Sequence, residues 1–422
     1  MRLAAFFNVK VQKGFLGRRK LSHKVQAHYR SANILGPRFL VHVASYGELE
    51  QAKPVISEIR KQYPSAHIHL TFFSPSGYEN TIGKYPEVDF ISYSPIDRRK
   101  DVRDFLDSAK PDIVLFARYD VWPNIAVKLQ RRNIPTILFA ATAAESSGRT
   151  MPFARALHAK VYQGLTRIFV ISEEDRARFV SMGVSSERLV VAGDTRYDRV
   201  LSRKAAIETS GELLLPVHVI HQIEEKHTLV FVVGSSWPKD EAIIEKTLKE
   251  SIARKDNILT IIVPHEPTTE HVDKLLSTYA GNAIRLSDLG SYAGEHIVIA
   301  DSIGKLFGLY RHADIAMIGG GFSNGLHNIL EAAVWGVPAI VGPNHRKSQE
   351  VQPLIDVLIA FEVTSAQEFD FVFWRLLQDN DLRESTGQKA RQFVEARRGA
   401  TAKVLSEIEL LLNDFPSFLR RG

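Results

Sequence analysis

The sequence predicts an α/β fold made of two Rossmann-like domains, each built on a doubly wound parallel sheet. Short apolar runs alternate with longer helical patterns between residues 39 and 192, and the same alternation returns between residues 228 and 341. The alternation is interrupted between residues 203 and 226. A chain of 422 residues is also too long for one ordinary core. These observations together predict two domains of similar size.

The expected strands are the apolar runs themselves. They cover residues 39–44, 67–73, 113–117, 136–140, 168–171 and 189–192, and then residues 228–233, 258–263, 296–299, 315–318 and 339–341. The resulting boundaries are a basic amphipathic segment over 1–38, a first domain over 39–205, a linker over 206–226, a second domain over 227–382 and mostly helical structure over 383–422.

Composition excludes several classes of protein. With 45% hydrophobic and 24% charged residues, the chain has the composition of a globular protein. It contains no cysteine, which excludes disulfides, thiolate catalysis and zinc sites built on cysteine. The net charge of +6 comes from residues 1–47, which hold nine Lys or Arg and no Asp or Glu, whereas the rest of the chain holds 45 basic and 48 acidic residues. An acidic body argues against a nucleic-acid-binding protein.

The N-terminal segment has an apolar stripe flanked by basic residues. Leu3, Phe7, Val11 and Phe15 are spaced four apart, as on one face of a helix. The basic residues lie off or beyond that stripe: Lys10, Lys13, Arg18, Arg19 and Lys20. This pattern favours a helix on an anionic membrane surface, and the alternative is a helix packed on the protein's own first domain. We expect no membrane span, because no apolar run approaches about 18 residues. We also expect no signal peptide, because the apolar part is not continuous and no small-residue cleavage site follows it.

The turn after the first expected strand carries two carboxylates. Ser45, Tyr46 and Gly47 lead from this strand into a helix whose first turn holds Glu48 and Glu50. For Glu50, favourable interaction with the helix dipole is the better interpretation. Glu48 follows the glycine directly at the carboxyl end of a strand, where open α/β folds expose their chemistry. An ionised carboxylate at that place could act as a general base toward a hydroxyl group.

A glycine-rich turn lies between two expected strands of the second domain. It follows the strand at 315–318, contains four glycines within residues 319–325, and leads into an amphipathic helix expected to open near Leu326. Backbone N–H groups of such a turn and the N-terminus of the helix can bind an anion, so a phosphate is the expected ligand.

Three polar residues occupy the start of this expected helix. The spacing of His327, Asn328 and Glu331 allows them to share one face beside the turn. The alternative is that Asn328 caps the helix and Glu331 is a solvated carboxylate favoured by the helix dipole. The residues alone leave both interpretations open.

Several motifs in fixed order resemble one enzyme family. They are HVASYGELEQAKPVI with LTFFSPSGYE, RYDVWPN, VAGDTRYD, GSSWPKDE, VPHEP and GGGFSNGLHNILEAAVWGVPAIVGP. Together they resemble the 3-deoxy-D-manno-octulosonic acid (Kdo) transferases of lipopolysaccharide synthesis. The resemblance implies a GT-B fold with two domains facing across a cleft, and inverting transfer of Kdo from CMP-Kdo to a lipid A precursor (lipid IVA). It also implies a peripheral or monotopic place on the cytoplasmic face of the inner membrane.

The resemblance also assigns roles to residues. It implies Glu48 as the catalytic base, with Ser45, Gly47 and Ser76 binding the acceptor. For the donor it implies Arg196, Ser235, Ser236, His265, Gly320, Gly321, His327, Asn328 and Glu331. The chain departs from the family pattern at Tyr46, where a smaller residue is usual, and at Leu326, which replaces a glycine.

The remaining expectations concern metals and rival functions. One Asp-x-Asp triplet exists, at Asp379 to Asp381, and a solvated turn explains it better than a metal site. We therefore expect no metal and no cofactor, with the glycine turn and basic residues stabilising the phosphate charge. The rival classes are another GT-B enzyme acting on a UDP-sugar, whether a transferase or a 2-epimerase, and a non-enzymatic nucleic-acid or membrane-surface binding protein.

Overall fold

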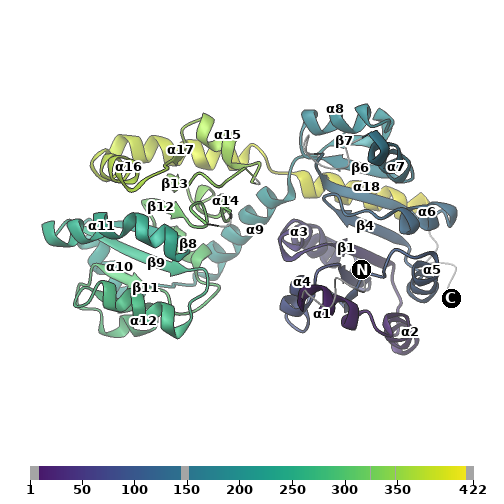
Figure 1. Ribbon diagram of the computed structural model, residues 1–422, viewed down its shortest axis with the longest axis horizontal. Helices are drawn as coiled ribbons and strands as arrows, with labels where there is room; N and C mark the ends of the chain where they lie inside the picture. The colour runs from purple at the N-terminus through teal and green to yellow at the C-terminus, as the bar shows by residue number, and fades with distance from the viewer. Residues whose placement is uncertain (1–8, 144–151, 324, 347, 415–422) are drawn as a thin grey trace. The chain divides into compact units, whose positions relative to one another are not determined.

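The computed structural model describes residues 9–143, 152–323, 325–346 and 348–414. The chain divides into two compact units. Unit 1 contains Met1–Arg199 and Arg397–Gly422, and unit 2 contains Val200–Ala396. Figure 1 shows each unit as a sheet covered by helices on both faces. The predicted class, two Rossmann-like parallel-sheet domains, is confirmed.

Unit 1 is built on a seven-stranded parallel sheet with the order β3-β2-β1-β4-β5-β6-β7. Alternate residues of each strand face opposite sides, so Leu40 and Val114 pack in one core while Val41 and Leu115 pack in the other. The strands are β1 (Arg38–Val43), β2 (His67–Phe72), β3 (Phe90–Tyr93), β4 (Ile113–Ala117), β5 (Thr136–Ala141), β6 (Arg167–Val170) and β7 (Leu189–Val191).

Helices cover both faces of this sheet, and most of them link one parallel strand to the next. They are α1 (Val9–Gly17), α2 (Leu21–Ser31), α3 (Tyr46–Gln62), α4 (Pro75–Thr81), α5 (Arg99–Ala109), α6 (Pro123–Arg131), α7 (Pro152–Gln163), α8 (Glu173–Ser181) and α18 (Ala400–Asp414). Helix α9 (Thr195–Ser210) begins in unit 1 and continues into unit 2.

Unit 2 repeats this plan with the strand order β10-β11-β9-β8-β12-β13-β14. Its strands are β8 (Leu229–Ser236), β9 (Ile258–Pro264), β10 (Ala283–Arg285), β11 (Ile297–Ile299), β12 (Ile315–Ile318), β13 (Ala339–Val341) and β14 (Ala360–Glu362). Its helices are α10 (Val217–Glu225), α11 (Pro238–Arg254), α12 (Thr269–Thr278), α13 (Leu306–Leu309), α14 (Leu330–Ala333), α15 (Val351–Asp356), α16 (Ala366–Gln378) and α17 (Asn380–Glu395).

The ends of the domains differ from the boundaries set from the sequence. The division falls after Arg199, so residues 206–226, which include the end of α9 and all of α10, lie within unit 2. The last helix, α18, belongs to unit 1, where Val404 and Ile408 share a core with Leu49 of α3. Asp198 holds the start of α18 by accepting hydrogen bonds from the N–H groups of Gly399 and Thr401 at 2.6 and 2.7 Å.

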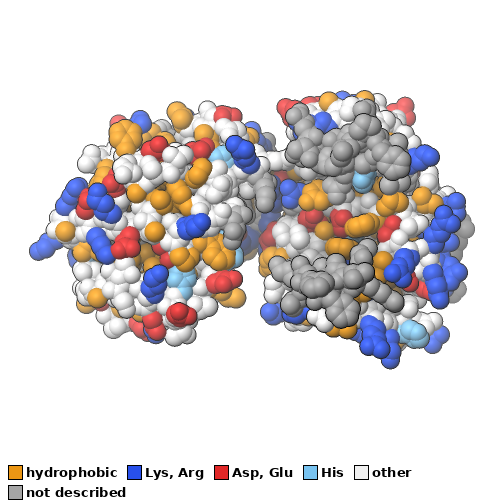
Figure 2. Space-filling model, in the orientation of Figure 1, with side chains coloured by type: hydrophobic (Ala, Val, Ile, Leu, Met, Phe, Trp, Pro, Cys, Tyr) orange, Lys and Arg blue, Asp and Glu red, His pale blue; other side chains and the backbone are white. Residues whose placement is uncertain are grey.

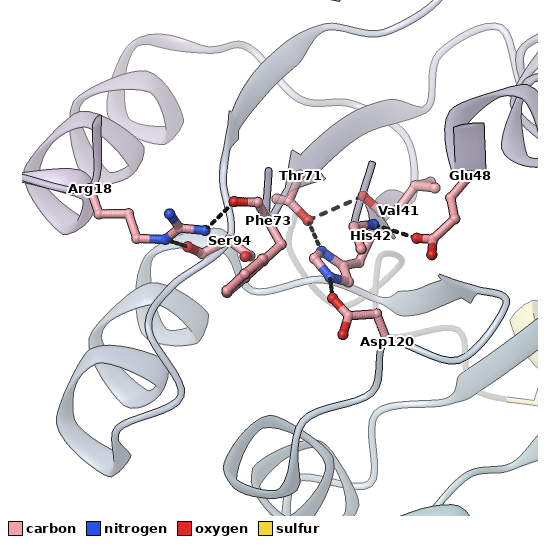
Figure 3. Close-up of polar contacts among 9 residues, drawn as sticks. Arg18, Val41, His42, Glu48, Thr71, Phe73, Ser94 and Asp120 are labelled. Carbon is pink, nitrogen blue, oxygen red and sulfur yellow. Dashed lines mark hydrogen bonds and ion pairs between the residues drawn. The ribbon is translucent and has the colours of Figure 1, made fainter. Parts of the chain in front are cut away.

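The described part of the N-terminal segment packs on unit 1. Leu21 and Val25 of α2 enter its core, and a Cβ on Gly17 would lie 2.2 Å from the ring of Tyr93. The Arg18 guanidinium donates to the carbonyl oxygens of Ser94 and Phe73 at 2.9 and 2.7 Å (Figure 3). Burial lowers the pKa of Arg18 to about 10. These contacts agree with the alternative interpretation, in which this segment packs on the protein's own first domain. Leu3 and Phe7 lie outside the described residues.

In each sheet the order of strands reverses at one place. Unit 1 reverses between β1 and β4, and unit 2 reverses between β8 and β12. In open α/β sheets the loops at the carboxyl ends of these two strands separate and leave a crevice where ligands bind. The topology alone therefore marks one candidate site in each unit.

Candidate active site

In unit 1 the loop after β1 places Glu48 at the point where the strand order reverses. Ser45 begins α3, because its side chain accepts a hydrogen bond from the Glu48 N–H at 3.4 Å. Glu48 turns back so that its Oε2 accepts from the Ala44 N–H at 2.5 Å. Beside it, a Cβ on Gly47 would meet only the Ser45 hydroxyl within 4 Å, so this approach is open.

The surroundings of Glu48 suit a base. The residue is 3% exposed. Burial raises the pKa of the Glu48 carboxyl, and the negative charge of Asp120 raises it further, against the Ala44 N–H, His42 and Arg118, which lower it. A carboxylate with a raised pKa takes a proton more readily at neutral pH. Within the described residues only Oε2 has a hydrogen-bond partner, so Oε1 remains available.

A buried polar chain lies next to Glu48. His42 contacts the hydroxyl of Thr71 through Nδ1 at 3.0 Å and the carboxylate of Asp120 through Nε2 at 3.2 Å (Figure 3). Asp120 follows β4, so this chain joins the two strands at which the order reverses. His42 and Thr71 were missed from the sequence. The available signal was a polar residue inside an otherwise apolar strand, since both side chains are buried.

The other expected residues of unit 1 lie nearby with internal partners. Ser76 is exposed in the first turn of α4, with its hydroxyl 2.8 Å from that of Ser74. Arg196 pairs with buried Asp194 at 2.7 and 2.9 Å. Burial alone would raise the pKa of Asp194, but Arg196 outweighs it and the pKa is lowered. Arg196 belongs to unit 1, whereas the other expected donor residues belong to unit 2.

In unit 2 the glycine turn is held by a carboxylate. Asp240 is fully buried and accepts hydrogen bonds from the N–H groups of Gly320 at 2.8 Å, Phe322 at 3.1 Å and Trp237 at 2.9 Å. The N–H groups of this turn were expected to bind a phosphate, but the N–H of Gly320 is occupied by Asp240. Gly321 packs against the backbone of Gly342, where a Cβ would lie 2.6 Å from the nearest atom.

The prediction of a helix that begins near Leu326 is wrong. Residues 325–328 have no regular structure, and α14 covers only four residues, Leu330–Ala333. The backbone N–H groups of Leu326 and His327 donate to Asn344 and Gly319 instead of forming a helical ladder. The side chain of Asn328 accepts from the Leu330 N–H at 3.2 Å, which is the capping role of the alternative interpretation. A one-turn helix of this kind gives no sizeable dipole.

Consequently, His327 and Glu331 do not share a helix face. Glu331 accepts a hydrogen bond from Arg203 at 2.8 Å, and Arg203 stacks on Phe307 at 4.1 Å. Arg203 also lines a cavity of about 160 Å³ together with Lys305. Arg203 was missed from the sequence because it lies in the polar part of α9 that follows the VAGDTRYD motif.

The two serines after β8 have different environments. Ser236 is buried, and its hydroxyl donates to Glu241 at 2.7 Å, so this donor serves the fold. Glu241 in turn contacts His271 at 2.9 Å. Ser235 is half-buried with a φ of 53°. Of this pair, Ser235 is the better placed for a ligand.

Three rings gather where the strand order of unit 2 reverses. Trp237 and His265 directly follow β8 and β9, and His327 follows β12. The ring of His265 stacks on Trp237 at 4.8 Å and on His327 at 4.3 Å. The indole N–H of Trp237 donates to Nε2 of His327 at 3.1 Å. Burial, and then His265, lower the pKa of His327 to about 4.

No group of three or more His, Asp or Glu that could hold a metal occurs among the described residues. In the Asp-x-Asp triplet, Asp379 caps α17 by accepting from the Leu382 N–H at 2.8 Å. Nor is any described helix both long and apolar enough to cross a bilayer.

Solved structures share this fold at low sequence identity. The UDP-GlcNAc 2-epimerase of Neisseria meningitidis is 15% identical, with a TM-score of 0.59 over 88% of this chain and 99% of that one. Acinetobacter baumannii MurG is 14% identical, with a TM-score of 0.55 over the same shares. The two parallel-sheet units thus define a protein of the GT-B class.

Sequence comparison is more specific. Residues 14–199 match the family described as 3-deoxy-D-manno-octulosonic-acid transferase (kdotransferase). The 3-deoxy-D-manno-octulosonic acid transferase of Haemophilus influenzae is 26% identical over 89% of this chain and 88% of its own length. That of Rickettsia bellii is 24% identical over 90% and 89%. Residues 14–199 therefore resemble this family, and the chain is similar to Kdo transferases over about 90% of its length.

Proposed function

We propose that this protein is an inverting glycosyltransferase that moves Kdo from CMP-Kdo to a lipid A precursor in lipopolysaccharide synthesis. The observation that carries this proposal is the position of Glu48. This buried carboxylate has one oxygen without a hydrogen-bond partner among the described residues, and it lies where the strand order of unit 1 reverses. Its motif lies within the residues that match the Kdo transferase family. Its raised pKa supports the role of general base.

The reaction is a single displacement at the anomeric carbon of Kdo. Oε1 of Glu48 accepts the proton of the attacking acceptor hydroxyl, whose oxygen forms the new bond to that carbon. The bond between the carbon and the phosphate oxygen of CMP breaks with its electron pair, so CMP leaves with one more negative charge. Attack opposite to the leaving group inverts the configuration.

We assign the donor to unit 2. The departing phosphate needs N–H or O–H donors, and His327 and Ser235 supply them near the reversal between β8 and β12. Glu331, fixed by Arg203, accepts hydrogen bonds from the ribose hydroxyls. Gly321 permits the close approach of the Gly342 backbone because it carries no side chain.

Release of nucleotide from two kinds of donor tests this assignment. With a tetraacylated lipid A precursor present, CMP-Kdo should release CMP, and UDP-GlcNAc should release no UDP. Turnover of the UDP-sugar alone would favour the second candidate, a UDP-sugar transferase or 2-epimerase. That candidate has one observation in its favour, the shared fold of the Neisseria meningitidis UDP-GlcNAc 2-epimerase.

We expect the reaction to proceed without a metal. Arg, His and backbone donors can stabilise the phosphate charge, and the only Asp-x-Asp triplet uses Asp379 to cap a helix. The initial rate should therefore be unchanged in excess EDTA. Loss of activity in EDTA that is restored by Mg²⁺ or Mn²⁺ would overturn this expectation.

We further propose that unit 1 contacts the anionic surface of the cytoplasmic membrane leaflet. Figure 2 shows Lys and Arg side chains gathered over α2 and α5. Lys24 of α2 and Arg19, which precedes α2, are exposed. Each basic residue near an anionic surface contributes about 1 kcal/mol, so Arg19→Glu with Lys24→Glu should weaken binding to phosphatidylglycerol vesicles about 30-fold or more.

The matched control reverses the charge of two exposed lysines of unit 2, by Lys246→Glu with Lys274→Glu. Co-sedimentation with vesicles at two salt concentrations compares the pairs. Equal weakening by both pairs would mean that net charge alone governs binding, and would contradict a binding face on unit 1.

A further inference from the structure

The ring stack of unit 2 fixes the state of one histidine. An indole N–H can only donate, so Nε2 of His327, 3.1 Å from the Trp237 indole nitrogen, must accept and carries no proton. The lowered pKa of His327, about 4, keeps the ring neutral at neutral pH. A neutral imidazole without a proton on Nε2 carries it on Nδ1. The contact with Trp237 therefore selects one tautomer.

The position of the ring is fixed as well. The backbone N–H of His327 donates to the Gly319 carbonyl at 3.1 Å, and His265 stacks on one ring face at 4.3 Å. A Cβ on Gly320 would lie 3.1 Å from Cδ2 of His327, so the turn closes on that carbon. Nδ1 is the remaining polar atom, and no described residue forms a hydrogen bond to it.

This free N–H lies where the topology of unit 2 favours a ligand. Trp237 and His327 follow β8 and β12, the two strands between which the sheet order reverses. At the same place the Gly320 and Phe322 N–H groups are already occupied by Asp240. These two backbone donors are therefore not available to an anionic oxygen, whereas the side chain of His327 offers a donor.

We propose that Trp237 is a positioning residue that holds His327 as its Nδ1–H tautomer, so that Nδ1 donates a hydrogen bond to a phosphate oxygen of the nucleotide donor. The assignment of the nucleotide rests on the proposed function. His327 in this state stabilises the departing phosphate by a hydrogen bond and does not transfer a proton to it. Nε2 accepts from the indole N–H and carries no proton, so the ring is neutral, and loss of the Nδ1 proton would leave an imidazolate anion.

Nitrogen NMR of the ligand-free protein tests the tautomer directly. In protein labelled with ¹⁵N-histidine at pH 7, the His327 signals, identified by their loss in His327→Asn, should show a protonated Nδ1 and an unprotonated Nε2. Trp237→Phe keeps an aromatic ring but removes the donor, so a protonated Nε2 should appear. The control Trp374→Phe, on α16, should leave the His327 signals unchanged.

Titration calorimetry with CMP tests the use of the proton. Trp237→Phe should lower CMP affinity about tenfold, the effect of one misplaced hydrogen bond. An Asn amide nitrogen lies near the place of Nδ1 and a Gln amide nitrogen near that of Nε2. His327→Asn should therefore bind CMP more tightly than His327→Gln.

The outcomes separate the two proposals. A protonated Nε2 in the parent protein, or Trp237→Phe with parental His327 signals and parental CMP affinity, would overturn the role of Trp237. Equal CMP affinity of the Asn and Gln variants would overturn donation by Nδ1. If the Nδ1–H tautomer is observed but the parent protein binds UDP and not CMP, the role of Trp237 stands and the proposed nucleotide is wrong.

Discussion

Glu48→Gln should lower the turnover number by roughly 10²-fold or more, since general-base catalysis contributes about 10²- to 10⁴-fold. The amide keeps the size of the side chain but cannot accept the hydroxyl proton. CMP affinity should barely change, because Glu48 belongs to unit 1 and acts on the acceptor. Single-turnover rates with saturating CMP-Kdo, beside calorimetric titration of CMP, measure the two quantities separately.

Two variants serve as comparisons. Glu50→Gln removes a neighbouring carboxylate of α3 that pairs with Lys53, and it should turn over at near the parental rate. Glu331→Gln should lower CMP affinity, because the ribose hydroxyls lose a charged acceptor. If Glu48→Gln keeps the parental rate, or loses CMP binding as badly as Glu331→Gln, Glu48 is not the base.

The raised pKa of Glu48 also sets the direction of a pH effect. The base must be ionised, so the rate should rise with pH through the pKa of Glu48, and this acid limb should lie above that of an ordinary Glu. Asp120→Asn removes a negative charge that raises this pKa, so it should move the limb to lower pH. A shift to higher pH would contradict the electrostatic account.

Asp240→Ala is expected to have the largest effect on stability. The change leaves the N–H groups of Trp237, Gly320 and Phe322 without their acceptor inside unit 2. Each buried unsatisfied donor costs about 1 to 3 kcal/mol, so the free energy of opening this region should fall by roughly 3 kcal/mol or more. Hydrogen exchange of β8 and β12, followed by mass spectrometry, measures that free energy.

Asp379→Ala is the matched control. Its carboxylate also accepts from a backbone N–H, that of Leu382, but it is exposed and holds only one. Loss of such a cap costs about 1 kcal/mol. A smaller effect for Asp240→Ala than for this control would mean that the glycine turn does not depend on the carboxylate.

The sequence predicted the fold well where strands are buried on both faces. Central strands such as β4 and β12 are continuous apolar runs, because helices cover both sides of a parallel sheet. The missed strands, β3, β10 and β14, lie at the edges, where short and partly exposed segments leave a weak pattern. The sequence shows that α18 has an apolar face, but it does not show which of the two sheets this face covers.

The candidate site was predictable only where its contacts are local. Ser45 and Glu48 interact within one turn of helix, and the sequence placed both residues where the first strand leads into that helix. The expected helix near Leu326 failed because the N–H of that residue bonds to Asn344, a distant partner. The ring stack was invisible for the same reason, since Trp237, His265 and His327 meet only through the strand order.

Product analysis tests the central claim most directly. The protein is incubated with CMP-Kdo and a tetraacylated lipid A precursor, and the lipid product is examined by mass spectrometry. We predict that the precursor gains the mass of one or more Kdo residues, and that Glu48→Gln forms this product at least about 100-fold more slowly. An unchanged precursor mass, with CMP-Kdo left intact or merely hydrolysed, would contradict the assignment of this chain as a transferase to lipid A.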